Sequence, residues 1–360
     1  MSKRPPRASG YFRTSYAQDQ SLIETRLEWS ALAAGIALLL VFPFFASPFV
    51  LDLAAQVLLA SVGALALALL TGYAGQVSLG HAGLIAAGAF TNGILFKEFA
   101  APFWITLPAA AATGALLGVV FGLPSLRLRG LYLAVSTLAL HFVVVYLGGE
   151  YETKRGYSTG IVIDPPRVFG YEVSSARAWY FVMLAAAALT LLLCLNLLRS
   201  RTGRAWRAVH SNETVAGALG INVATAKLSA FVISSSITAV AGALFAYHRG
   251  FVSVEAFSLY LSIQYIAMII IGGMGSLLGA LLGAVFVTLF PYGIEALLNM
   301  LPGAQRYASQ LFAVNYAAFG VVMILFLVFE PLGLVGIYKR LQSFFLLWPF
   351  KQTPIAGGRK

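Results

Sequence analysis

The residues best suited to polar chemistry in this apolar chain lie in one stretch, Thr71 to Gly83, where glycines alternate with hydrogen-bonding side chains. Glycines this dense break a helix, and irregular backbone at membrane depth is tolerated only inside protein or beside a wet cavity. The stretch is therefore a candidate wall of a solute path. A plain turn at the membrane surface is the alternative. The candidate path residues are Gly72, Tyr73, Gly75, Gln76, Ser78, Gly80 and His81.

A second polar region, residues 199–227, is basic and separates two long apolar segments. Within it, residues 211–220 have the pattern of a short helix. Ser211 or Asn212 can accept bonds from its first free amides, and Gly220 can end it. A membrane protein that presents a small helix on a basic loop has something to dock there, which indicates a subunit driven from outside the membrane. We expect Arg204, Arg207 and Glu213 to orient or dock this loop and Gly217 and Gly220 to keep it slim, with Ala216 as a further residue of the same coupling element.

The apolar segments themselves offer few ionisable groups. Only His141 lies inside one, whereas Asp52, Glu295 and Glu330 lie near segment ends. Intramembrane ionisable residues usually mark ion pathways, so coupling to protons or sodium is disfavoured. The sequence contains no phosphate-binding Gly-x-x-x-x-Gly-Lys-Ser/Thr loop, no His-Glu-x-x-His motif, no paired cysteines and no nucleophile elbow. We therefore predict no catalytic residue, no metal ligand and no enzyme activity in this chain.

The composition requires a membrane to hold these regions in place. Hydrophobic residues make up 59% of the chain and charged residues 10%, which excludes a soluble globular domain. A crossing takes about 20 apolar residues, and the chain has material for about ten crossings. We predict an all-α, polytopic integral membrane helix bundle. The expected spans are residues 31–50, 53–71, 83–97, 103–123, 131–148, 179–198, 228–248, 260–271, 277–297 and 312–330.

Glycine-rich sequences mark how these spans connect and pack. The eighth and ninth are separated only by residues 272–276, so they are two spans with a tight turn or one broken element. We favour two spans, because the run is too long for one crossing of about 30 Å. Small residues four apart, at Gly114 with Gly118 and at Gly279 with Gly283, let helix backbones approach closely. We expect tight packing within one bundle there.

The formal charge of +11 is placed as membrane topology places it. The cations lie at the ends of apolar segments, which argues against a nucleic-acid partner. With the N-terminus inside, most lysines and arginines fall on the inner side, so both termini and the basic loop are expected in the cytoplasm. Membrane lipid is expected around the bundle. The expected organisation is a cytoplasmic lead (1–30), a membrane domain (31–334) and a basic amphipathic tail (335–360) that can lie at the interface.

Three motifs in order resemble one family. Residues 72–82 read GYAGQVSLGHA, residues 127–132 read RLRGLY, and residues 203–208 read GRAWRA, followed by Glu213 and by ALGIN at 218–222. Together they look like the signature of the LivM-type permeases of bacterial branched-chain amino acid ABC transporters. The resemblance covers roughly residues 30–335.

The resemblance implies a type II ABC importer permease fold in the bacterial inner membrane, with a cytoplasmic coupling helix, near residues 211–220, gripped by an ATPase. It implies four partners: a LivH-like second permease, two cytoplasmic ATPase subunits and a periplasmic solute-binding protein. ATP would be bound by the ATPases, so no cofactor is expected in this chain. Branched-chain and other hydrophobic amino acids are the leading substrates. Urea, short amides and aromatic acids, which related members carry, are the alternatives.

Two rival functions lack the residues they need. An ion-coupled secondary carrier would need intramembrane carboxylates or a sodium cage. A lipid-modifying membrane enzyme would need a cluster of Asp, His or Arg at one interface, and Arg127 with Arg129 is better explained by membrane anchoring. The sequence therefore favours the permease subunit.

Overall fold

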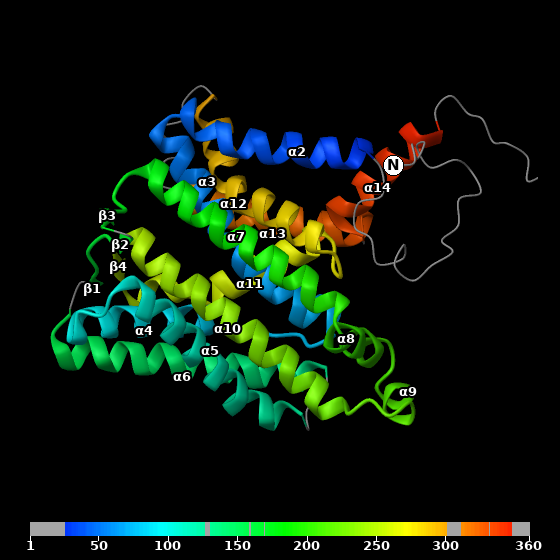
Figure 1. Ribbon diagram of the computed structural model, residues 1–360, viewed down its shortest axis with the longest axis horizontal. Helices are drawn as coiled ribbons and strands as arrows, with labels where there is room; N and C mark the ends of the chain where they lie inside the picture. The colour runs from blue at the N-terminus through cyan, green and yellow to red at the C-terminus, as the bar shows by residue number, and fades with distance from the viewer. Residues whose placement is uncertain are drawn as a thin grey trace, which may run out of the picture.

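The computed structural model describes residues 26–126, 130–157, 160–168, 170–300, 311–330 and 332–347, and this part of the chain is a helix bundle (Figure 1). The long helices are α2 (Arg26–Val41), α3 (Pro48–Leu67), α4 (His81–Phe99), α5 (Phe103–Ser125), α6 (Leu131–Arg155), α7 (Ala176–Arg199), α10 (Val223–Arg249), α11 (Leu259–Gly272), α12 (Leu277–Asn299), α13 (Leu311–Phe329) and α14 (Gly333–Leu347). Two short helices, α8 (Arg201–Ser211) and α9 (Glu213–Ala218), lie between α7 and α10.

Nine of the ten predicted spans each fall on one helix, but the count of about ten membrane crossings is not confirmed. Among the described residues, six helices are long and apolar enough to cross a membrane: α3 with its following turn, α5, α6, α7, α10 and α12. A seventh is counted if α13 and α14, bent by 54°, form one span. The apolar helices at Trp29–Phe44 and Leu259–Gly272 are shorter, and in α4 three glycines with Thr91 and Asn92 dilute the apolar residues.

The first predicted span, 31–50, is wrong as a single helix. Helix α2 stops at Val41, a 3-10 turn covers Phe42–Phe44, and α3 starts at Pro48. Pro43 has no backbone N–H to continue the helix. Ser47 then caps α3, its side chain accepting a hydrogen bond from the Val50 amide at 3.4 Å.

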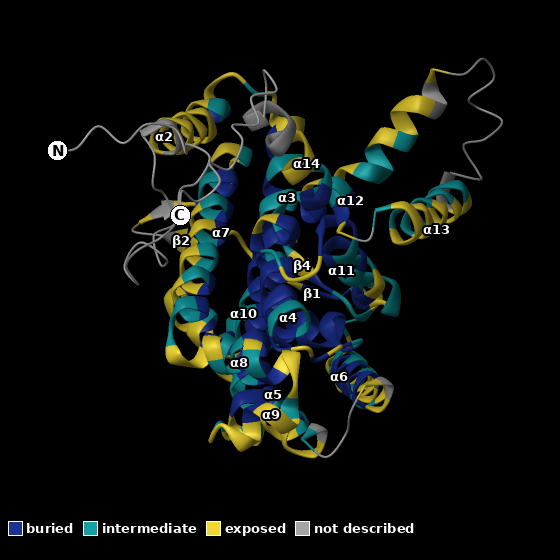
Figure 2. Ribbon diagram, turned by 90° about the vertical axis from the view of Figure 1, so that its right-hand side faces the viewer, coloured by how far each residue is buried: buried dark blue, intermediate teal, exposed yellow. Residues whose placement is uncertain are grey.

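Helices α3, α4 and α10 form the inside of the bundle (Figure 2). Helix α10 packs against α5, α4 and α3, and α3 also packs against α7 and α12. The span containing α3 is 72% buried, whereas the span of α7 is only 22% buried. The outer helices therefore leave apolar faces for lipid or for another membrane subunit.

Glycines set the close approach of the inner helices. A Cβ at Gly88 of α4 would collide with the Ala239 carbonyl of α10, and one at Gly242 of α10 would collide with the Ile85 carbonyl of α4. Backbone contact this close leaves no room for a side chain. Gly114 and Gly118 of α5 likewise abut α10, and Gly279 and Gly283 of α12 abut α11, which confirms the predicted packing of these motifs within one bundle.

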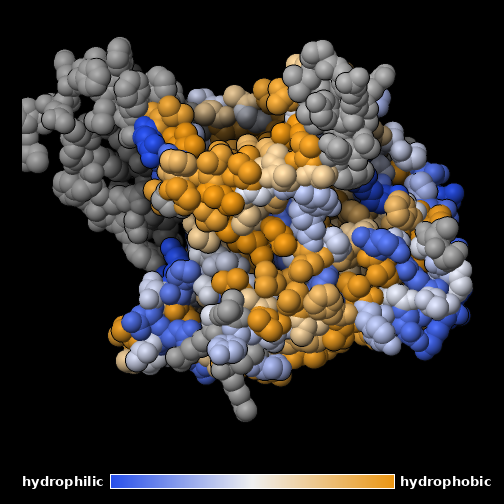
Figure 3. Space-filling model, turned by 180° about the vertical axis from the view of Figure 1, so that it is seen from behind, coloured by the Kyte–Doolittle hydropathy of each residue, from blue (hydrophilic) through white to orange (hydrophobic). Residues whose placement is uncertain are grey.

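The bundle has two polar ends separated by an apolar belt (Figure 3). One end carries α8 and α9. The other carries two small antiparallel sheets, β1 (Ile161–Val162) with β4 (Phe251–Val252) and β2 (Arg167–Val168) with β3 (Tyr171–Glu172). Ile161 pairs with Val252, and Arg167 pairs with Glu172. An apolar belt with polar ends is the surface that a membrane-embedded bundle presents.

Parts of three predicted regions lie outside the described residues: 1–25 of the lead, 127–129 of the RLRGLY motif and 348–360 of the tail. The tail begins within α14. Its location at the membrane interface stays a prediction.

Candidate functional site

The polar side chains at positions 76, 78 and 81, in the stretch that follows α3, are buried inside the protein. Helix α3 passes into a π-helical turn, η2 (Ala68–Tyr73), and the chain is then non-helical until α4 begins at His81. Gln76, Ser78 and His81 are 3%, 1% and 1% exposed. This placement matches the expectation that irregular backbone is enclosed by protein. The role of the stretch in a solute path stays a prediction.

Long-range hydrogen bonds hold this stretch to three different helices, α10, α6 and α11. Side chains thereby satisfy the polar groups that the broken helix leaves without helical partners. The bonds run from Gln76 Nε2 to the Lys227 carbonyl, from the Leu79 amide to Thr137 Oγ1, and from the Ala82 amide to Ser262 Oγ, each at 2.9 Å.

Two side-chain atoms in the stretch are buried without a hydrogen-bond partner among the described residues: Ser78 Oγ and His81 Nε2. The His81 ring packs against the Tyr265 ring of α11 at a centroid distance of 4.7 Å. An unsatisfied buried polar group costs about 1–3 kcal/mol, so each one calls for an explanation. His81 therefore both supports Tyr265 and leaves hydrogen-bonding capacity inside the bundle.

The glycines of the stretch bring other segments against it. A Cβ at Gly72 would lie 2.8 Å from the Gly275 amide nitrogen, so the glycine breaks after α3 and after α11 meet. Gly75 has φ +70°, and a Cβ there would lie 2.6 Å from Nδ1 of His210 in α8. Gly80 packs against α6 in the same manner, and Tyr73 is half-buried at the end of η2. The predicted path residues thus form one contiguous, glycine-packed segment that touches α8.

The basic region 199–227 contains two helices, where the sequence predicted one. Helix α8 buries Gly203, Trp206 and Val209, which recur every three residues, and Trp206 Nε1 donates to Ser229 Oγ of α10 at 3.1 Å. The spacing of these three residues was the available signal for an amphipathic helix. The sequence analysis interpreted this segment as a loop because of its basic residues.

The predicted short helix is present as α9. Asn212 caps it, its Oδ1 accepting from the amides of Thr214 at 3.0 Å and Val215 at 3.1 Å. Ser211, the alternative cap, belongs to α8 and donates to the Arg207 carbonyl. Gly220 follows α9 with φ +84°, a left-handed conformation that suits glycine at a helix end.

The two predicted arginines turn back onto the end of α7. Arg204 Nη1 donates to the Arg199 carbonyl at 2.7 Å, and Arg207 Nη2 donates to the Leu198 carbonyl at 3.0 Å. The last carbonyls of a helix lack helical partners and carry the negative end of its dipole, so guanidinium groups suit them. Arg204 and Arg207 therefore fix the angle between α7 and α8.

Glu213 forms an ion pair with Lys227, the last residue of the 199–227 region. Its Oε1 lies 2.5 Å from Nζ of Lys227, which is 8% exposed and belongs to α10. The Lys227 carbonyl also receives the bond from Gln76. The first turn of α9, the start of α10 and the buried stretch after α3 are thereby joined through one residue.

The outer surface of α9 is apolar. Ala216 is buried and Gly217 is exposed, while Val215 and Leu219, one turn apart, are 53% and 76% exposed. The sequence analysis missed Val215 and Leu219, although their spacing of four places them on one face. Exposed apolar side chains at a polar end are a candidate contact surface for a partner.

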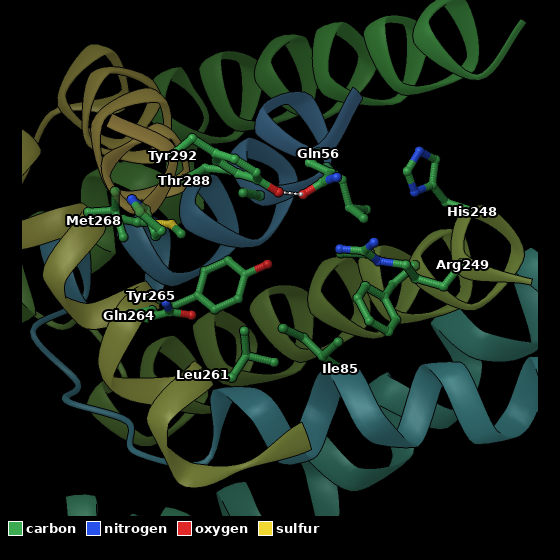
Figure 4. Close-up of a pocket in the computed structure, with 16 residues that line it drawn as sticks. Gln56, Ile85, His248, Arg249, Leu261, Gln264, Tyr265, Met268, Thr288 and Tyr292 are labelled. Carbon is green, nitrogen blue, oxygen red and sulfur yellow. Dashed lines mark hydrogen bonds between the residues drawn. The ribbon is translucent and has the colours of Figure 1, made fainter. Parts of the chain in front are cut away.

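The inner helices also enclose a cavity of about 280 Å³, bounded by α3, α4, α10, α11 and α12 (Figure 4). Its polar lining includes Gln56, Arg249, Gln264, Tyr265 and Tyr292. The sequence analysis selected none of these five residues. None of the predicted path residues is among those that line this cavity. The path segment instead contacts the wall of the cavity, because the His81 ring packs against the ring of Tyr265, which lines the cavity.

One edge of the cavity is a chain of polar contacts. Gln56 Nε2 donates to Asp52 Oδ2 at 2.6 Å, and Tyr292 donates to Gln56 Oε1 at 3.3 Å. Asp52 Oδ1 also lies 3.3 Å from Nε2 of His248. These four residues join α3, α10 and α12 at the end of the bundle that bears the β-strands. Within the part of the chain that the structure describes, no group of three or more His, Cys, Asp or Glu is arranged to hold a metal ion.

Comparison with known proteins gives a family match over most of the chain. Residues 49–328 match the family described as "Branched-chain amino acid transport system / permease component". The high-affinity branched-chain amino acid transport system permease proteins LivM of Salmonella typhimurium and Escherichia coli are 32% and 33% identical to this chain. Each comparison spans 295 residues and covers 75% of this chain and 69% of the relative.

Similarity extends to other importer permeases. A probable branched-chain amino acid transport permease protein LivH of Methanocaldococcus jannaschii is 25% identical, over 71% of this chain and 82% of that protein. An autoinducer 2 import system permease protein, LsrC, of an Enterobacter species is 29% identical over 51% of this chain. No solved structure matches.

Proposed function

This chain belongs to the family of permease components of branched-chain amino acid transport systems, and from that premise we propose how it works and what it carries. It is a membrane-embedded permease subunit of an ABC importer. Its proposed substrates are branched-chain amino acids, the cargo named for the similar LivM proteins, together with other hydrophobic amino acids. The proposed energy source is ATP bound and hydrolysed by partner subunits, with no catalysis in this chain.

The proposed orientation places α8, α9 and both termini in the cytoplasm. The basic residues of the 199–227 region support it, because loops rich in lysine and arginine stay on the cytoplasmic side. The end with β1 to β4 then faces away from the cytoplasm, where a solute-binding protein would deliver substrate. The proposed membrane is the bacterial inner membrane.

The proposed coupling element is α9. Val215 and Leu219 would insert into a groove of an ATPase, while the Asn212 cap keeps the short helix rigid. The observation that carries the proposal is the connection from Glu213 through Lys227 to Gln76. A displacement of α9 by the ATPase would pull on the start of α10 and on the buried stretch together. A bundle with two packed arrangements needs only such a bias to open alternately to either side.

The proposed assembly contains a LivH-like second permease, two ATPases and a periplasmic binding protein. The similarity of this chain to proteins named LivM and LivH supports a pair of related permeases. The mostly exposed apolar face of α5, whose span is 28% buried, is available to lipid or to that second permease.

Purification of the chain from native membranes in mild detergent, with mass spectrometry of retained proteins, tests this assembly. We expect a stoichiometric ATPase and a second permease. With Val215→Asp, the ATPase should be lost while the second permease is retained, because a carboxylate cannot enter an apolar groove without a large desolvation cost. Recovery of the chain alone, after cross-linking, would refute the proposed function.

Orientation is tested separately by cysteine labelling. The chain has one cysteine, Cys194, which is buried and can be replaced by serine. A single cysteine at Thr214 should react with an impermeant maleimide only in inside-out vesicles. A cysteine at Arg167, on β2, should react only in right-side-out vesicles. The opposite pattern would invert the proposed topology.

A further inference from the structure

The cavity of about 280 Å³ is lined by His248 and Arg249 at the end of α10, shortly before β4, so it lies near the end of the bundle that bears the β-strands. We propose that it is a binding site for one zwitterionic amino acid with an aliphatic side chain, held by its carboxylate at Arg249. The inference rests on the proposed function and adds a selective site inside the permease itself. Pockets for larger ligands measure about 300–1,000 Å³, so this cavity has the size for one small solute.

The anion partner is Arg249, the last residue of α10. It is exposed at the mouth of the cavity, and its guanidinium points inward, 5.9 Å from the centre of the Phe245 ring (Figure 4). Among the described residues, no carboxylate pairs with it. The Tyr265 hydroxyl points into the same space and has no hydrogen-bond partner among the described residues. A guanidinium beside a hydroxyl donor matches a carboxylate, because guanidinium forms paired, charge-assisted hydrogen bonds with it.

The ammonium partner is a second polar edge of the cavity, formed by Gln56 with its hydrogen-bond acceptor Asp52. Gln56 gives its amide hydrogen to the Asp52 carboxylate, which polarises the amide and makes Oε1 a stronger acceptor. The Tyr292 hydroxyl shares Oε1 only at 3.3 Å, a long hydrogen bond that an ammonium group can displace. The site then has a positive group, Arg249, for the carboxylate and a negative group, Asp52, near the acceptor of the ammonium.

Most of the remaining lining is apolar, which suits an aliphatic side chain. Leu59, Ile85, Leu261, Met268 and Val287 belong to it, beside the polar residues His248, Gln264 and Thr288. Urea has no carboxylate for Arg249 and no apolar group to bury against these walls. Bound urea would leave Arg249 unpaired, which lowers the affinity of the site for urea. The site thus favours apolar amino acids over the small neutral amides.

Binding of leucine to the purified importer complex, without the binding protein, tests the site. Arg249→Gln should weaken leucine binding by at least about tenfold, the loss expected for a charge-assisted hydrogen bond. Arg249→Lys should restore part of it. Arg177→Gln is the matched control, because Arg177 lies over the Phe44 ring at the same end and does not line the cavity. Leucinamide, which lacks the carboxylate, should bind the unmodified complex as weakly as leucine binds Arg249→Gln.

A second variant fills the cavity without removing charge. Leu261 is partly buried in the wall, and Leu261→Trp would occupy the space of the substrate side chain. It should weaken leucine binding more than alanine binding. In proteoliposomes with the binding protein, both Leu261→Trp and Arg249→Gln should keep stimulated ATP hydrolysis but import less leucine for each ATP. A purely structural defect would lower both together.

The outcomes separate this inference from the function it rests on. Failure of the unmodified chain to assemble with an ATPase would remove the proposed function and the site with it. Normal assembly and normal coupled hydrolysis, with leucine binding and leucine imported per ATP unchanged in both variants, would overturn the site alone. Equal binding of leucinamide and leucine would also overturn it, and tight urea binding insensitive to Arg249→Gln would assign the cavity to neutral amides.

Discussion

Helix α9 and the buried stretch from Gly72 to His81 are joined through Lys227 but are held in place by different forces. Helix α9 has six residues, most of them exposed, and is fixed by the Asn212 cap and the Glu213–Lys227 ion pair. The stretch after α3 has its polar side chains Gln76, Ser78 and His81 buried, and it is fixed by glycine contacts and by bonds to three helices.

The difference concerns how each region can move. A single hydrogen bond contributes about 0.5–1.5 kcal/mol net, so α9 can shift against a partner and lose little stability. Close-packed backbones have no such freedom, because any approach meets atomic repulsion and any separation opens a void. We infer that the inner helices move as bodies and that adjustment occurs at the α8–α9 end.

The largest expected effect comes from adding one methyl group where α4 meets α10. Gly88→Ala places a Cβ against the Ala239 carbonyl, so the helices must separate. We expect a loss of about 3 kcal/mol or more, since overpacking of this severity exceeds the usual cost of an added methylene. Folded protein recovered in detergent and its thermal unfolding measure this.

Gly35→Ala in α2 is the matched control, because a Cβ there meets no atom within 4 Å. It should be neutral or slightly stabilising, as alanine favours helix. Equal behaviour of the two variants would mean that the inner helices are not close-packed.

The next effect tests the stretch after α3 for transport. Gly75→Leu adds a side chain at φ +70° and against His210, so it should block transport while subunit assembly survives. The backbone strain alone is about 1–2 kcal/mol. Gly156→Leu has nearly the same strain, at φ +72°, but no neighbour within 4 Å, and should retain transport. If uptake survives in Gly75→Leu, the stretch is only a turn.

Charge reversal at α9 should act on coupling more than on folding. Glu213→Lys puts two cations together where the ion pair was, at a local cost of about 2 kcal/mol. Insertion should be preserved, whereas stimulated ATP hydrolysis and transport should be abolished. Exchange of both charges, Glu213→Lys with Lys227→Glu, should restore part of the activity. Unimpaired uptake in the single variant would remove Glu213 from the coupling role.

The smallest expected effect concerns the cap. Asn212→Ala removes the acceptor for two amides of α9 and should cost about 1 kcal/mol of local stability. Transport should fall by a few fold and recover partly with Asn212→Asp, which caps equally well. Ser211→Ala should have little effect, and the reverse ranking, measured as uptake rate, would assign the cap to Ser211.

The sequence predicted those features that local patterns decide. Apolar runs located the long helices from α2 to α13, and Ser211 or Asn212 with Gly220 marked α9, because capping chemistry acts within a few residues. The predicted count of about ten crossings is not confirmed, since an apolar run shows that a helix is buried or in lipid but not that it crosses. Pro43 was the local sign that 31–50 would break.

Features that depend on distant contacts were not predictable in this way. The bond from Gln76 to Lys227 joins residues 151 positions apart, and that from Ala82 to Ser262 joins residues 180 apart. The cavity likewise assembles Gln56, Arg249 and Tyr265 from three helices, and none of them stands out in its own segment. Only the packing order of the helices brings such residues together.

The Gln76–Lys227 contact has a consequence for how this sequence can diverge. Gln76 bonds to the backbone carbonyl of Lys227, and every amino acid supplies that carbonyl. Glu213 pairs with the positively charged side chain of Lys227, and most amino acids have no positive charge. Over evolutionary time, positions 213 and 227 should change as a correlated pair, with opposite charges kept or lost together. Position 76 should be indifferent to whatever occupies 227, so the tie between the interior and the surface can outlast the ion pair.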